Sequence, residues 1–486
     1  MGEAAAAGVS AAHPIRLQVT DDLQRTRLTV FFRLLLAIPH FLWQALLAIV
    51  AILAVIASWF ATLISGRSPD GLHSFLAGYL RYATHVSAYM FLIADPYPVF
   101  RELREEEPVH RSPVLGGVVL TRFADVKACL NDPRLSSDRI TPLVRHRRDR
   151  EHAAEIQQLG RMLGLWAVFT DPPKHTQLRG LMNTAFTTRA VEQLRSRVEA
   201  LVAELIDQVR DRGELDLIRD FAWPLPITVI AEMLGVPRED RPALKAWSDE
   251  LAAFVGSALA TPDKYERAAR SGGKMSDYFR DLIATRRARP RGDLLSALVA
   301  AGAGHDTTSE DELVATAILL LFAGHETTTN LIGNGILSLL RHPAALHALR
   351  ADPSLIVPAV EELLRYEGPT AAMVRIALED VGVPSGGAIG RGDRVFLMIN
   401  AANRDPRQFD EPDRVDIRRD PNRHIAFGYG LHFCVGAPLA RLEAQIAIPA
   451  LLRRLPDLAL TTDPLPWLDS LVFRGVRSLP LTFRPE

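Results

Sequence analysis

The sequence contains only two cysteines, Cys129 and Cys434, among 486 residues. Two thiols so far apart exclude a disulfide framework and argue for a reducing compartment, and an iron–sulfur cluster would need about four cysteine ligands. A formal net charge of −1 gives no electrostatic footprint for nucleic acid. No glycine-rich dinucleotide-binding motif follows a predicted strand. We therefore expect electrons, if the protein uses them, to come from separate proteins.

Charged side chains are absent from a long N-terminal stretch, residues 34–64, whose only strongly polar residues are His40 and Gln44. This stretch exceeds the ~20 residues that cross a bilayer, and it is too long for a signal peptide. A buried globular helix is the alternative. A second stretch, residues 72–94, carries Arg81, and an arginine at mid-bilayer costs about 2.5–3.5 kcal/mol. We expect this stretch to be either a second span or an amphipathic helix at the membrane surface.

Arginines flank the two stretches on their outer sides. The flanking residues are Arg16, Arg25, Arg27 and Arg33 before the first stretch and Arg101, Arg104 and Arg111 after the second. Positive charge tends to stay on the cytoplasmic side of a membrane. A hairpin of two spans that turns at residues 65–71 keeps both groups inside, whereas a single span would separate them. The sequence therefore favours the hairpin over the single span.

Cys434 lies in a glycine-rich segment, residues 427–436, directly before an apolar helix. The three glycines of this segment remove side chains where a large flat ligand would meet the backbone. Leu439, Leu442 and Ile446 follow at helical spacing, so the cysteine stands at a helix N-terminus, where the helix dipole and free amides stabilise a thiolate. The pattern favours a thiolate metal ligand beside a planar group over a buried structural cysteine.

Polar residues interrupt a second apolar helix, predicted across residues 319–329. Gly324, Glu326 and three consecutive threonines weaken a helix interior, and threonine can hydrogen-bond to the carbonyl of the preceding turn. A local rule broken inside a buried helix is where a functional site is expected. The alternative is a kinked core helix with satisfied threonines.

A third motif pairs Glu362 with Arg365, which share one face of a predicted helix. By itself this pattern is weak, because exposed pairs are common and contribute at most about 1 kcal/mol. Pro412 and Arg414 form a Pro-x-Arg sequence farther along the chain.

Together, these motifs resemble the cytochrome P-450 superfamily. Its haem-binding loop has phenylalanine, two glycines, histidine or arginine, cysteine and glycine in the arrangement of residues 427–436. Its Ala/Gly-Gly-x-Asp/Glu-Thr stretch, Glu-x-x-Arg helix and Pro-x-Arg loop match residues 323–327, 362–365 and 412–414. The resemblance implies a mainly α fold with smaller β-sheets (α+β). It implies no catalytic role for Glu362, Arg365 and Arg414, which would form a buried network holding the cysteine loop.

The match begins near residue 93, which predicts a haem-thiolate domain of residues 93–486 after an N-terminal membrane-anchoring region of residues 1–92. Residues 27–40 and 66–69 resemble a family of small bacterial membrane proteins of unknown function. We therefore expect a protein anchored in the bacterial inner membrane with its haem domain in the cytoplasm.

The resemblance also implies a site, residue by residue. Cys434 would be the metal ligand, binding the iron of haem (heme b, iron protoporphyrin IX) through its thiolate. The expected contacts of the haem propionates are His175, Arg179, Arg375 and His432. The expected catalytic residues are Thr327, which would hydrogen-bond the oxygen, and Glu326, on the route of the protons. The apolar side chains expected around the substrate are those of Leu319, Phe322, Ala323, Val374, Ile376, Leu471, Val472 and Phe473.

The function implied is that of a monooxygenase that inserts one oxygen atom from O2 into an apolar organic substrate. Its electrons would come from a ferredoxin or flavodoxin-type donor with a reductase. A membrane anchor favours a small lipophilic substrate. Two alternatives stay open: a peroxide-driven haem-thiolate enzyme, and a non-catalytic membrane-anchored haem sensor.

Overall fold

The computed structural model describes residues 50–52, 54, 55 and 62, and then 96–113, 115–146, 152–183, 186–256, 263–303 and 308–485. The chain divides into two compact units, Met1–Pro96 and Tyr97–Glu486. The predicted membrane stretches 34–64 and 72–94 lie almost wholly outside the described residues. Among the residues that are described, no helix is long and apolar enough to cross a membrane.

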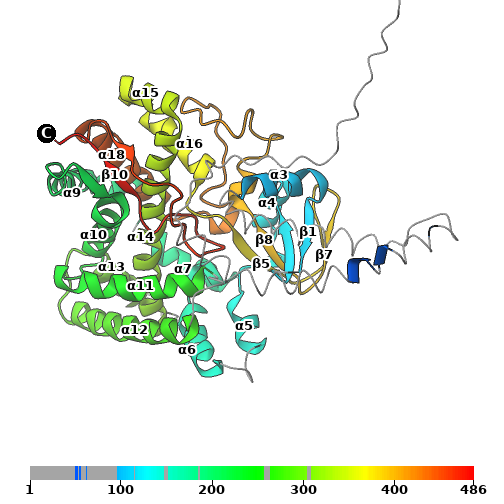
Figure 1. Ribbon diagram of the computed structural model, residues 1–486. Coiled ribbons are helices and arrows are strands. Elements are labelled where there is room, and N and C mark those ends of the chain that lie inside the picture. Colours follow the sequence, from blue (N-terminus) through cyan, green and yellow to red (C-terminus); the bar gives the residue numbers. More distant parts are fainter. Residues whose placement is uncertain are drawn as a thin grey trace, which may run out of the picture. The chain divides into compact units, whose positions relative to one another are not determined.

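Helices make up most of the second unit, and those from α9 to α14 gather on one side of it (Figure 1). The first half of the unit contains α3 Tyr97–Glu106, α4 Phe123–Leu130, α5 Ile140–His146, α6 Ala153–Leu163, α7 Lys174–Asn183, α8 Thr188–Glu192, α9 Arg195–Asp207, α10 Pro224–Met233 and α11 Arg241–Val255. The second half contains α12 Lys264–Ala288, α13 Leu294–Ala303, α14 Glu310–Arg341, α15 Pro343–Ala351, α16 Ile356–Glu367, α17 Ile399–Ala402 and α18 Ala437–Arg454.

The longest helix, α14, passes through the centre of this unit. It begins with a capping box, in which Ser309 and Glu312 each accept a hydrogen bond from the other's backbone amide. Most of its residues from Leu313 to Leu339 are buried, because it packs against α10, α12, α16 and α18 on different sides. An apolar surface all round is expected of such a core helix, so the polar residues in its middle need another explanation.

The β-structure is small and lies mostly on the side of α3 and α4 (Figure 1). The main sheet has the order β1-β2-β8-β5-β3, formed by β1 Val109–Ser112, β2 Gly117–Leu120, β8 Arg394–Leu397, β5 Met373–Ala377 and β3 Leu135–Ser136. Among the described strands of this sheet, β2 and β8 pair in parallel and the other neighbours are antiparallel. The smaller sheets are β4 Glu214–Asp216 with β10 Pro480–Thr482 and β9 Ala459–Leu460, and β6 Val381–Gly382 with β7 Ala388–Ile389. The mainly helical fold with small sheets is as the sequence predicts.

Candidate active site

Cys434 stands between a short 3-10 turn, Gly430–His432, and the start of α18 at Ala437. Its backbone amide donates to the carbonyl of Phe427 at 2.9 Å, which closes the loop. Gly428 and Gly430 adopt left-handed φ angles of 74° and 72°, and a Cβ at Gly430 would collide with the side chain of Asn131. The turns of the loop therefore require these two glycines. This reason differs from the one given by the sequence, in which the glycines leave room for a flat ligand.

Opposing effects act on the thiol of Cys434. Burial is the largest of them and raises its pKa overall, while the backbone amides of Gly436 and Ala437 and the guanidinium of Arg179 act to lower it. Each of these three groups favours the thiolate. A cation bound to the sulfur would stabilise the thiolate further.

The four residues predicted to contact the propionates come together from three elements. His175 and Arg179 lie on α7, Arg375 lies on β5, and His432 precedes the cysteine by two positions. The rings of His175 and His432 are 4.2 Å apart, centroid to centroid. Burial, then Arg375, His175 and Arg179, lower the pKa of His432 to about 3. The group therefore consists of two guanidiniums beside two imidazoles that stay neutral, and all four side chains can donate hydrogen bonds.

This cluster fits an anionic ligand. Arg375 is 5% exposed, its hydrogen bond goes to the carbonyl of Val374 at 3.1 Å, and burial lowers its pKa to about 10. Nδ1 of His175 is buried with no hydrogen-bond partner among the described residues. Unpaired buried donors are costly. The two propionate carboxylates of haem would satisfy them with charge-assisted hydrogen bonds.

The polar part of α14 holds two threonines bonded to the preceding turn. The hydroxyl of Thr327 donates to the carbonyl of Ala323 at 3.2 Å, and that of Thr328 donates to the carbonyl of Gly324 at 3.5 Å. Gly324 has a packing reason of its own, because a Cβ there would come within 2.8 Å of Ile230 on α10. The unusual composition of this stretch is thus partly structural.

Glu326 is a carboxyl group tuned toward neutral pH. Burial, together with the nearby carboxylate of Asp249, raises its pKa to about 7, against the opposing effects of Lys245 and the side-chain amide of Asn330. Asp249 and Lys245 lie on α11 and pair at 2.5 Å. A group of this kind can both release and recover a proton near pH 7.

Glu362 and Arg365 form a network in which every charge is paired. Arg365 makes two hydrogen bonds to Glu362, at 2.7 and 2.8 Å, and both side chains are fully buried. It also donates to the carbonyls of Asn403 at 2.9 Å and Pro412 at 2.8 Å. The side chain of Asn403 accepts from the amide of Ile425 at 2.9 Å. This connects the pair to the chain just before the cysteine loop.

The predicted part of Arg414 in this network is wrong. Its guanidinium is 65% exposed and pairs with Glu411 at 2.8 Å, and only its carbonyl accepts a hydrogen bond from Arg365, at 3.0 Å. Arg419 supplies the second guanidinium instead, donating to Glu362 at 3.1 Å. A Pro-x-Arg match cannot tell whether its arginine contributes a side chain or a carbonyl.

The sequence interpretation also missed two polar residues beside the propionate cluster. The hydroxyl of Ser137 is 2.9 Å from Nε2 of His432. Asp171 accepts from the backbone amide of Ser137 at 2.9 Å and from the hydroxyl of Ser136. These hydrogen bonds hold β3 and Ser137, the residue that follows it, beside the propionate cluster. No sequence signal distinguishes such residues from ordinary turn residues.

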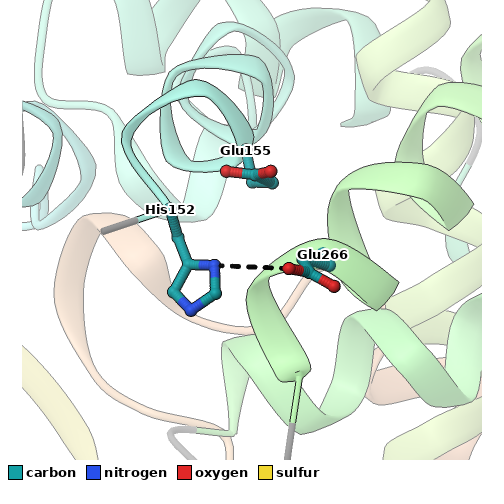
Figure 2. Close-up of side chains that lie close together, drawn as sticks. All are labelled: His152, Glu155 and Glu266. Atoms are coloured by element: carbon teal, nitrogen blue, oxygen red, sulfur yellow. Dashed lines mark ion pairs between the residues drawn. The ribbon is translucent and has the colours of Figure 1, made fainter. Parts of the chain in front are cut away.

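A separate polar cluster lies between the N-terminal ends of α6 and α12 (Figure 2). His152 pairs with Glu266 at 3.7 Å and stacks on Tyr265 at 5.3 Å between ring centroids. With Glu155 it forms a set whose ligand atoms lie within 4.8 Å of one another. Since all three side chains are partly or largely exposed, we interpret the set as an ion pair that joins two helices.

A cysteine at a helix N-terminus, beside guanidiniums and imidazoles that fit propionates, is the arrangement of a haem-thiolate protein. The family model "Cytochrome P450" matches residues 143–466, and the chain belongs to this family. It is therefore a cytochrome P450 monooxygenase, and its cofactor is haem. The predicted family, enzyme class and cofactor are confirmed.

Among its relatives, the cytochrome P450 monooxygenase PikC of Streptomyces venezuelae is 45% identical over 80% of this chain and 92% of its own length. The vitamin D(3) 25-hydroxylase of Pseudonocardia autotrophica is 42% identical over 81% of this chain and 94% of its own. A solved structure of P450BioI in complex with a fatty-acid-ligated acyl carrier protein has a TM-score of 0.75 at 38% identity, covering 80% of this chain and 98% of that one.

The N-terminal region matches a different model, "Domain of unknown function (DUF4389)", over residues 27–101. This confirms the predicted resemblance to a family of unknown function. The membrane character of the region and the predicted boundary between residues 92 and 93 stay predictions.

Proposed function

We propose that the enzyme inserts one oxygen atom from O2 into an apolar organic substrate, with electrons from a ferredoxin- or flavodoxin-type donor and its reductase. Haem, when bound, supplies the activation of oxygen. Cys434 would hold its iron, and the cluster of His175, Arg179, Arg375 and His432 would hold its propionates. The observation that carries the proposal is the adjacent pair of Glu326, with a pKa of about 7, and Thr327 on the central helix.

In this proposal Glu326 and Thr327 move protons inward. The carboxyl of Glu326 takes up a proton from the side of α11, where Asp249 and Lys245 lie. The hydroxyl of Thr327 donates its proton to the carbonyl of Ala323, so its oxygen can accept a hydrogen bond and would hold a protonated group in place at the site. A peroxide-driven enzyme or a haem sensor would need no such pair, which favours the monooxygenase.

The proposal is tested with Thr327→Ala beside Thr327→Ser, in protein supplied with NADPH and surrogate ferredoxin and reductase. We expect Thr327→Ala to consume NADPH at a rate near wild type while the product becomes hydrogen peroxide. Thr327→Ser keeps the hydroxyl and should keep most of the product. A product yield in Thr327→Ala equal to wild type would remove the role of this hydroxyl.

We further propose that the electron donor docks beside the cysteine loop. Three large apolar side chains of this loop are exposed, Tyr429 at 41%, Leu431 at 58% and Phe433 at 41%. The ammonium of Lys127 lies 4.7 Å from the ring centroid of Tyr429, which adds positive charge to the patch. Exposed apolar groups with adjacent charge are typical of a weak, transient interface. A Leu431→Asp variant should therefore slow reduction by the donor and leave haem content unchanged.

A lipophilic substrate is part of the proposal. Among the similar solved structures, one contains a fatty-acid-ligated acyl carrier protein, one testosterone and one myristic acid. These ligands differ in size and shape but share a large apolar body. We propose a substrate of that general character for this chain.

We also propose that residues 1–92 anchor the enzyme in the bacterial inner membrane as a hairpin. Labelling with a membrane-impermeant maleimide distinguishes the topologies, because Ser68 would face the periplasm in the hairpin. A Ser68→Cys variant should then be labelled in intact spheroplasts, and a Ser10→Cys variant only after lysis. Labelling of Ser10→Cys without lysis would indicate a single span, and release of the protein by carbonate would contradict the anchor.

A further inference from the structure

Arg139, the residue before α5, lies between two segments of the helical side. Its Nη2 donates to the carbonyl of Val255, the last residue of α11, at 3.3 Å. Its guanidinium carbon lies 4.6 Å from the ring centroid of Phe169, which ends a short 3-10 helix, Ala167–Phe169. A guanidinium against an aromatic ring keeps its donor edge available for a planar anion.

An aromatic row leads from this guanidinium to the centre of the molecule. Phe169 stacks on Trp166 at 5.9 Å, and Trp166 lies 5.3 Å from Phe322 on α14, centroid to centroid. Phe322 in turn lies 6.1 Å from Phe473. Phe322 directly precedes Ala323, whose carbonyl accepts the hydroxyl of Thr327. The row therefore connects Arg139 with the part of α14 where we place the proton transfer.

The surroundings of Arg139 are positive. In the part of the chain that the structure describes, no carboxylate pairs with it. The charged groups that act on it are Arg375 and Arg394, and with burial they lower its pKa to about 10. A partly buried cation that faces only like charges is costly to keep, and an anion would relieve that cost.

We propose that Arg139 binds a carboxylate carried by an otherwise apolar substrate, whose body lies along the aromatic row toward Thr327. This assignment rests on the proposed function and narrows its substrate class to apolar acids. A haem propionate is the alternative carboxylate that Arg139 could bind, because Arg375, which acts on Arg139, belongs to the propionate cluster. Arg139 contacts Val255 at the end of α11 and Phe169, whereas the propionate cluster lies on α7, β5 and the cysteine loop. The contacts therefore favour the substrate.

The test is a spectral titration of full-length, haem-loaded protein in detergent with dodecanoate and with methyl dodecanoate. The acid and the ester share the apolar chain and differ in charge. We expect wild type to bind the acid at least about tenfold more tightly than the ester, because hydrogen bonds to a charged partner are the strong ones. Arg139→Gln should lose this preference and bind the ester within about twofold of wild type. Arg139→Lys should keep part of it.

Arg394→Gln is the matched control, since it removes a neighbouring positive charge without touching the proposed contact and should keep the preference. An acid-to-ester ratio in Arg139→Gln equal to wild type, or no binding of the acid by wild type, would overturn the proposal. A drop in haem content in Arg139→Gln with an unchanged ratio would assign Arg139 to a propionate and also overturn it. Because binding needs no turnover, a preference for the acid without product formation would contradict only the proposed monooxygenase reaction.

Discussion

Two groups of buried charge flank the cysteine loop, and they differ in one respect. Around Glu362 and Arg365, each charged group finds partners within the chain, including Asn403 and Arg419. In the propionate cluster, Arg375 donates to one backbone carbonyl and a ring nitrogen of His175 has no partner, as far as the described part of the chain shows. A buried network that satisfies itself stabilises the fold, whereas one that is left unsatisfied points to a ligand.

The largest effect should come from breaking the satisfied network. Arg365→Leu leaves Glu362 as a buried charge that Arg419 alone must balance. We expect the free energy of unfolding to fall by about 3–5 kcal/mol, with loss of haem from the purified protein. Urea unfolding followed by circular dichroism measures the change, and a loss below 1 kcal/mol would contradict the structural role.

The corresponding change in the unsatisfied cluster, Arg375→Leu, should behave in the opposite way. Without haem it removes an unpaired buried cation, so the stability of the haem-free protein should stay equal or rise. With haem it removes a partner of a carboxylate, and dissociation of haem to an excess of a scavenging protein should become about tenfold faster or more. A large loss of stability in the haem-free variant would show that Arg375 stabilises the fold, as Arg365 does.

The pH dependence of stability extends this comparison to Glu326. Folding raises its pKa, so the folded protein holds this proton more tightly than the unfolded chain. Ionisation of the carboxyl therefore lowers the free energy of unfolding as pH rises from about 4.5 to 7. Relative to wild type, Glu326→Gln should therefore gain stability across that range, on the order of 1–2 kcal/mol after allowance for partial exposure. Parallel stability curves for the two proteins would show that the carboxyl is not perturbed.

The smallest effect should come from Arg414→Ala. The motif arginine contributes its carbonyl to Arg365, and alanine keeps that carbonyl. The lost pair with Glu411 is exposed, so we expect a change in unfolding free energy below about 0.5 kcal/mol. A loss comparable to that of Arg365→Leu would show that the side chain takes part in the buried network after all.

The sequence predicted the parts of the site that depend on fixed spacing. Cys434 before α18, the polar break in α14 and the Glu362–Arg365 pair each have a local pattern that dictates their geometry, and the fold class was implied by the family that these motifs resemble. Arg414 was misassigned because a pattern of residue types does not say which atoms of an arginine are used. Ser137 and Asn403 were missed because their partners lie far away in the sequence, and only tertiary packing brings them together.

The reduced, carbon-monoxide-bound absorption spectrum of the detergent-purified protein, beside Cys434→Ala, tests the central claim most directly. The account predicts the red-shifted Soret band of a haem–thiolate in wild type and its loss in the variant. A band typical of histidine or protonated-thiol ligation in wild type, or an unchanged red-shifted band in Cys434→Ala, would contradict it.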